Sequence, residues 1–118
     1  MAKVEVQTAG ALFPTPVILA TTVSKENTPN IITLAWVGVV CSQPFVVSLA
    51  IRPSRYSHQL LTATQEVVIN VPTRKIVAQT DRCGTVSGRN TVKAALTGLT
   101  FLPAALVSPP LIAECPIN

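Results

Sequence analysis

The stretch from Ile31 to Ile51 contains no charged residue, and this constrains the fold more than any other feature of the chain. An apolar stretch of this length could span a membrane as one helix. However, the polar turn sequence Cys41-Ser42-Gln43-Pro44 interrupts it, and Val, Ile and Thr are frequent on either side. These features favour two buried strands joined by a turn. We therefore expect a sheet that is covered on both faces or curled into a barrel, and no membrane span.

The composition indicates a small protein with an unusually apolar surface. The 118 residues are enough for a single domain, which we place at residues 1–118. Hydrophobic residues make up 48% of the chain, charged residues make up 12%, and the mean hydropathy is +0.48. Such a chain is expected to cover part of its surface with a partner subunit, so we expect a homo-oligomer.

The net charge of +4 suits an anionic partner such as a nucleotide, a phosphate-bearing cofactor or nucleic acid. Nucleic acid is the least favoured of these partners, because the basic residues form no long run and aromatic residues make up only 4% of the chain. The three cysteines are widely spaced and form no C-x-x-C pair, so neither a metal site nor a disulfide framework is indicated. No signal peptide is visible, and we expect a cytoplasmic protein with reduced thiols.

The pattern of strands and helices predicts an antiparallel sheet or barrel with helices at one side, a mainly β or α+β fold. Ser54 is the expected N-cap of the first helix, and Gly84 and Gly98 are expected to end the second and third helices. No dinucleotide or P-loop glycine motif is present. The expected strands cover residues 15–23, 31–40, 45–51 and 66–71, and the expected helices cover residues 55–64, 73–82 and 90–97. The polar cluster at residues 25–30 predicts a hairpin turn between the first two strands.

A polar run follows the uncharged stretch and forms a candidate anion site. Ser54 and Ser57 lie in the first turn of an expected helix, where free backbone N–H groups and the helix dipole favour an anion. Arg52 precedes this turn and could bind phosphate oxygens in a bidentate manner. The alternative is that the run is only a helix start. His58 is a weak candidate for acid–base catalysis, because no neighbouring carboxylate is available to tune it.

The second expected strand could form the wall of a flat ligand. By the two-residue period of a strand, Thr33, Ala35 and Val37 share one face, and Trp36 lies on the other. A small residue beside a hydroxyl would let a planar ring approach the backbone. The alternative interpretation is that Thr33 and Ala35 merely fit a crowded barrel wall and that Trp36 fills the core.

The loop at residues 83–89 is a further candidate site. Its glycines, Gly84 and Gly88, flank Ser87 and would allow the backbone to approach a ligand closely, while Arg89 and Lys93 would place positive charge beside it. Alternatively, these residues only end one helix and begin the next.

The sequence resembles the flavin reductase-like, FMN-binding split-barrel family, and most closely its flavoredoxin-type branch. The order and spacing of the matching motifs cover nearly the whole chain. The segments that carry the resemblance are residues 28–36, 41–44, 51–57, 83–89 and 113–116.

The resemblance implies a homodimeric split β-barrel that holds FMN, or alternatively FAD, near the subunit interface. Members of the family usually continue past the segment that matches residues 114–118, so a C-terminally short domain is implied. Arg52, Ser54 and Ser57 would bind the phosphate. The flavin ring and ribityl chain would be lined by Asn30, Thr33, Leu34, Ala35 and Trp36, with Cys41 and Ser42 close by, and covered by Ser87, Gly88, Arg89 and Lys93.

The function that we expect is that of a flavoprotein oxidoreductase, in which the flavin accepts a hydride from NADH or NADPH and passes electrons to a second acceptor. No side chain is an obvious acid, base or nucleophile, so we assign no catalytic residue. The alternative is a non-enzymatic electron carrier that works with a redox partner protein. A small basic barrel that binds nucleic acid is a remote third alternative.

Overall fold

The computed structural model describes residues 1–5, 7 and 12–118. The fold is mainly antiparallel sheet with a few helices, which confirms the predicted fold class. Among the described residues, no helix combines the length and the apolar character needed to cross a membrane. The strands are β1 (Ile18–Val23), β2 (Pro29–Leu34), β3 (Val37–Ser42), β4 (Phe45–Leu49), β5 (Val68–Asn70), β6 (Phe101–Leu102) and β7 (Leu111–Ile112); the helices are α1 (Tyr56–Thr64), the short 3₁₀ helix η1 (Arg74–Ile76), α2 (Val77–Thr85) and α3 (Lys93–Thr97).

The main sheet has the strand order β2-β1-β5, and all neighbours are antiparallel. β1 and β2 form the predicted hairpin, with Ile18 opposite Leu34 at one end and Val23 opposite Pro29 at the other. β1 is the central strand and is buried along its whole length, because apolar clusters cover both of its faces. β2 is an edge strand, so the backbone groups on its outer side have no strand partner within this sheet.

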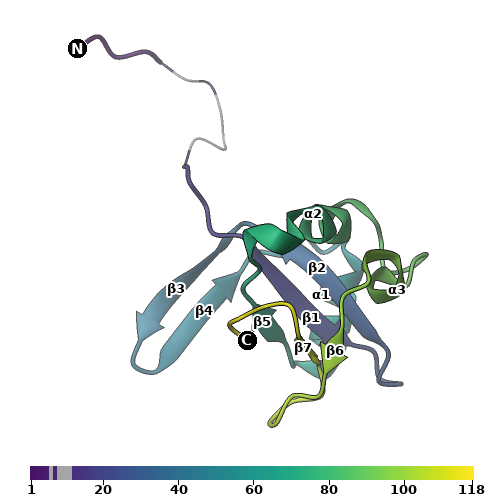
Figure 1. Ribbon diagram of the computed structural model, residues 1–118. Coiled ribbons are helices and arrows are strands. Elements are labelled where there is room, and N and C mark those ends of the chain that lie inside the picture. Colours follow the sequence, from purple (N-terminus) through teal and green to yellow (C-terminus); the bar gives the residue numbers. More distant parts are fainter. Residues whose placement is uncertain (6, 8–11) are drawn as a thin grey trace.

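Helices flank the open edge of β2 on both faces of the sheet. Leu19 and Ile31 pack with Cys83 of α2 on one face, whereas Ile18 and Ile32 belong to a separate cluster on the other face. α1, α2 and α3 all contact β2, and Figure 1 shows α1 behind the sheet, with α2 and α3 beside it. This arrangement leaves a recess along the outer edge of β2, between α1 and α2.

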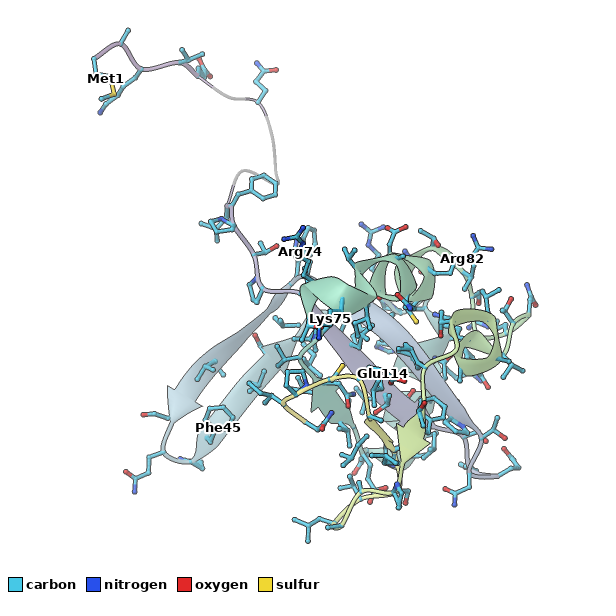
Figure 2. The ribbon with its side chains drawn as sticks, viewed as in Figure 1. Met1, Phe45, Arg74, Lys75, Arg82 and Glu114 are labelled. Carbon is cyan, nitrogen blue, oxygen red and sulfur yellow. The ribbon has the colours of Figure 1, made fainter. Side chains whose placement is uncertain are left out.

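The prediction of one continuous strand over residues 31–40 is wrong. The chain bends at Ala35 and Trp36, and β3 pairs with β4 in a separate two-stranded hairpin that extends away from the main sheet (Figure 1). The bend also shifts the predicted alternation, so Val37 packs against the cluster that contains Leu34. The expected burial of this stretch on both faces holds for β2 but not for the hairpin, and Phe45 at its tip is 71% exposed (Figure 2).

The helix boundaries also differ from the prediction. Arg55, not Ser54, is the N-cap residue of α1, and no side chain caps this helix end. Gly84 lies within α2 and does not end the helix. The helix passes close to β2 at this position, since a Cβ atom on Gly84 would lie 3.3 Å from the Cβ of Thr33. α3 begins at Lys93 rather than at residue 90. Gly98 ends α3 as predicted, in the left-handed conformation with φ of 70°.

The C-terminal segment is fixed to the main sheet by the fully buried side chain of Asn70. Its amide nitrogen donates to the carbonyl of Leu19 at 3.0 Å, and its oxygen accepts from the Ile112 backbone N–H at 2.9 Å and from the Asn118 side chain at 2.8 Å. The Thr21 hydroxyl adds a 2.6 Å bond to the carbonyl of Pro110. Because these buried polar groups satisfy one another, the C-terminal segment is anchored to β1 and β5, towards the edge of the sheet opposite β2.

Candidate functional site

The recess at the edge of β2 is a cavity of about 260 Å³. Its walls come from the first part of β2, the turn before α1 and its first residues, the last turn of α2, the loop that follows α2, and the start of α3. It therefore brings together segments that are far apart in the sequence. The predicted site residues that line it are Asn30, Ser54, Ser57, Ser87, Gly88, Arg89 and Lys93.

The charge of the cavity wall is entirely positive. Arg55, Arg89 and Lys93 contribute cations, and the described residues that line the cavity include no aspartate or glutamate. The three serine hydroxyls in the wall can each donate a hydrogen bond. A set of cations and hydroxyl donors with no carboxylate is suited to an anion with several oxygens, such as a phosphoryl group.

Lys93 is the cation that most strongly indicates an anion site, because its side chain is only 6% exposed. Its Nζ donates a 2.7 Å hydrogen bond to the backbone carbonyl of Cys83. Burial is the main reason that its pKa is lowered; Cys83 acts in the opposite direction, and the charge of Arg55 lowers the pKa further. No carboxylate is among the groups that shift this pKa. An ammonium group that is buried without a carboxylate partner would gain strongly from a bound anion.

A hydrogen bond between Asn30 and Ser57 joins the edge strand to α1. The amide nitrogen of Asn30 donates to the Ser57 hydroxyl oxygen at 2.8 Å, and both side chains are buried. Because Ser57 accepts this bond, the hydrogen of its hydroxyl remains free to be donated to another group. Ser57 is thus held in place by the protein while keeping a donor available at the cavity wall.

The loop after α2 is docked tightly on this pair. A Cβ atom on Gly88 would overlap the side-chain oxygen of Asn30 and would lie 3.0 Å from the Tyr56 ring, so only glycine fits there without a shift. The next residue, Arg89, donates to the backbone carbonyl of Ser54 at 3.0 Å and to the Gln59 side chain at 3.4 Å. Its guanidinium also lies 5.5 Å from the centre of the Tyr56 ring. The predicted close approach of the glycine loop is therefore to the protein's own strand and helix.

Other predicted site residues lie outside this cavity. The Arg52 side chain is exposed and does not line it, whereas Arg55, which the sequence analysis left unassigned, does. Thr33 donates to the backbone carbonyl of Thr80, and Leu34 is buried in the apolar cluster beneath the sheet. The sequence signal for Arg55 was its place at the expected start of this helix, between Ser54 and Ser57.

Ala35 and Trp36 line a second, larger and more apolar groove of about 740 Å³, together with residues 12–16 and parts of β3 and β4. Trp36 is 64% exposed, so it does not fill the core. Cys41 and Ser42 are exposed on β3, in the hairpin that extends away from the main sheet. His58 lies on α1, and neither cavity includes it in its wall.

Comparison with known proteins identifies the family. Residues 10–118 match the model of the flavin reductase like domain. The chain belongs to this family. Among solved structures, it is similar to the flavoredoxin of Desulfovibrio vulgaris, with 33% identity, a TM-score of 0.91, and coverage of 96% of this chain and 62% of that one. It is also similar to a flavoredoxin from Methanosarcina acetivorans, with 26% identity, a TM-score of 0.84, and coverage of 98% and 60%.

A related sequence from Archaeoglobus fulgidus, an uncharacterized protein, is 34% identical over 96 residues, which cover 81% of this chain and 54% of that protein. The chain therefore spans about half the length of this relative and less than two thirds of the two flavoredoxins. The match to the family model confirms the suspected family, and TM-scores of 0.91, 0.80 and 0.79 against solved structures confirm the split-barrel fold.

The Gly88 contact predicts a sharp difference between two glycines of this flavin reductase-like domain. Gly88→Ala should lower the free energy of unfolding by about 1–3 kcal/mol, because the added methyl group displaces Asn30 or the loop. Gly38→Ala should change it by less than about 0.5 kcal/mol, because a Cβ there meets nothing within 4 Å. Urea unfolding of both variants measures this difference. Equal stability of the two variants would show that the loop does not dock on Asn30.

Proposed function

We propose that this protein binds FMN and acts as a flavin-dependent oxidoreductase that is reduced by a nicotinamide nucleotide. The observation that carries the proposal is the cavity at the edge of β2: buried Lys93, two arginines and three serines with no carboxylate, in a chain that belongs to the flavin reductase-like family. The donor set fits a phosphate monoester, because each phosphate oxygen would find a cation or a hydroxyl hydrogen.

In this proposal Ser54, Ser57 and Lys93 bind the phosphate, with Arg55 adding charge. Ser57 is oriented by Asn30 and donates its hydroxyl hydrogen. Lys93 keeps one N–H on the carbonyl of Cys83 and directs its remaining donors to the ligand. Arg52 is exposed one turn before α1, and we propose that it contacts the outer side of the ligand.

The flavin ring is proposed to lie along the outer edge of β2. Asn30 lines the phosphate cavity and Ala35 lines the second groove, and the five residue steps from one position to the other span about 16 Å of extended chain. This distance is comparable to the length of an extended mononucleotide. The backbone of Thr33 and Leu34 would then face the ring edge, and Trp36 would lie at its far end. We propose the loop Ser87–Gly88–Arg89 as a cover, and Cys41 and Ser42 as neighbours contributed by the hairpin.

When bound, the flavin supplies the redox chemistry by accepting a hydride and releasing electrons one or two at a time. The side chains of the cavity bind and orient the cofactor and place positive charge beside it. Hydride transfer to a flavin needs no acid or base from the protein, so this proposal assigns no catalytic residue.

We also propose that two copies of the chain associate through the β3–β4 hairpin. Val39, Val40 and Phe45 are each more than 60% exposed on a hairpin without a charged residue. Such a contiguous apolar surface favours association. Because the hairpin adjoins the groove that contains Trp36, a second copy would lie close to the proposed ring site.

The phosphate assignment predicts that FMN binds more tightly than riboflavin and that Lys93 accounts for much of the difference. Lys93→Met should weaken FMN binding at least tenfold, a loss of about 1.4 kcal/mol, and leave riboflavin binding unchanged. The control is Lys75→Met, which makes the same substitution at an exposed lysine of η1 outside the cavity (Figure 2). Quenching of flavin fluorescence measures all of these affinities.

The melting temperature of ligand-free Lys93→Met should be no lower than that of the wild type, because a buried charge has been removed. Equal affinities for FMN and riboflavin, or an unchanged FMN affinity in Lys93→Met, would contradict the phosphate assignment. In the same titration, an unchanged affinity in Arg52→Ala would remove Arg52 from the site, and FAD in place of FMN tests the choice of cofactor.

The similarity to two flavoredoxins favours an electron carrier as the second candidate function. Anaerobic stopped-flow mixing with NADH or NADPH separates the two candidates. As an oxidoreductase, the FMN-loaded protein should lose its oxidised flavin absorbance within seconds of mixing, because the groove at Trp36 leaves the ring face accessible. A carrier would stay oxidised until a partner reductase was added. Persistent oxidation with both nucleotides would therefore overturn the enzymatic proposal and retain the flavin site.

A further inference from the structure

We propose that Arg89 is a positioning residue that latches the Val86–Arg89 loop onto the start of α1 and so slows the release of the phosphorylated ligand. The role in ligand release rests on the proposed flavin function, whereas the latch itself is a property of the ligand-free protein. Arg89 is expected in the loop that covers the flavin. Its guanidinium contacts three groups of α1 and of the turn before it.

The three contacts of Arg89 use different features of the guanidinium. One terminal nitrogen donates to the backbone carbonyl of Ser54 at 3.0 Å, and the other donates to the side chain of Gln59 at 3.4 Å. The planar face lies 5.5 Å from the centre of the Tyr56 ring. A lysine could supply the charge but not the fork of two nitrogens or the planar face. This geometry is therefore specific to arginine.

The latch connects two parts of the cavity wall. Ser54 lies on one side, and Ser87 and Gly88 lie on the other. The loop is already shaped for this contact, since the Arg89 backbone N–H bonds to the Ser87 hydroxyl and the Asn90 N–H bonds to the Ser87 carbonyl. Gly88 removes the side chain that would keep the loop away from Asn30. A ligand held by Ser57 and Lys93 would therefore be released faster if this part of the wall could move away from α1.

The competing interpretation is that Arg89 acts directly on the phosphate through its charge. The two interpretations predict different results for Arg89→Lys. A latch needs the fork and the planar face, so lysine should behave like alanine. A direct electrostatic contact needs only a cation, so lysine should behave nearly like arginine.

The first experiment measures backbone hydrogen exchange in the ligand-free, full-length protein by NMR. Arg89→Ala and Arg89→Lys should both raise the exchange rates of the Arg89 (or substituted residue) and Asn90 amides by about tenfold, the size expected from losing a hydrogen bond and a cation–π contact. Arg82→Ala is the matched control, because it removes the same charge from the exposed surface of α2, outside the cavity (Figure 2). Unchanged exchange in both Arg89 variants would overturn the latch, whatever the protein binds.

The second experiment measures the dissociation rate of FMN by stopped-flow dilution in the same variants and in Gln59→Ala. The latch predicts about tenfold faster release for both Arg89 variants, a smaller increase for Gln59→Ala, and a double variant no faster than Arg89→Ala alone. Wild-type release in Arg89→Lys would overturn the latch while leaving the flavin site intact. Absence of FMN binding in the wild type would overturn the proposed function and the latch's role in release, and the exchange experiment would still decide whether the loop is latched.

Discussion

The hydrogen bond from Asn30 to Ser57 is the interaction on which the site depends. It joins the open edge of β2 to the first turn of α1, and it is buried from solvent. The same Asn30 side chain is the surface against which Gly88 packs, so one amide group positions a strand, a helix and a loop. Because all three elements form the wall of one cavity, loss of this contact would separate the donors that the cavity brings together.

The distribution of charge gives this cavity its chemical character. A folded protein normally pairs a buried lysine with a carboxylate, since an unpaired buried charge is costly. Lys93 instead has a backbone carbonyl as its partner and two arginines in the same cavity wall. A phosphate group would supply the missing negative charge. We therefore infer that binding of a phosphate group at Lys93 also stabilises the folded protein.

Local sequence signals predicted a large part of this arrangement. The Val, Ile and Thr residues around a polar turn indicated the β1–β2 hairpin, and Gly98 indicated the end of α3. Ser57 and Lys93 were selected separately, from the helix start and from the glycine loop, and the structure places both in the wall of one cavity. Whether they bind a cofactor stays a prediction.

The remaining features depend on long-range packing that a single sequence does not show. Nothing in an uncharged run marks the bend at Ala35 and Trp36, so one strand was predicted where the structure has two. Gly84 was predicted to end a helix, but it lies inside α2, where its missing side chain lets the helix pass close to Thr33. Arg52 and Arg55 are both arginines of the same polar run, and the sequence alone does not show which of them lines the cavity. In the structure, Arg55 directly precedes the first helical residue, Tyr56, and lines the cavity.

The most direct test of the account is to map the binding of FMN and riboflavin onto the backbone amides by two-dimensional ¹H–¹⁵N NMR. The account predicts that both ligands shift the amides of residues 33–36, whereas only FMN shifts those of Ser57, Gly88 and Lys93. Shifts confined to the β3–β4 hairpin, or an identical pattern for the two ligands, would contradict the central claim that the cavity at the edge of β2 binds a phosphate group.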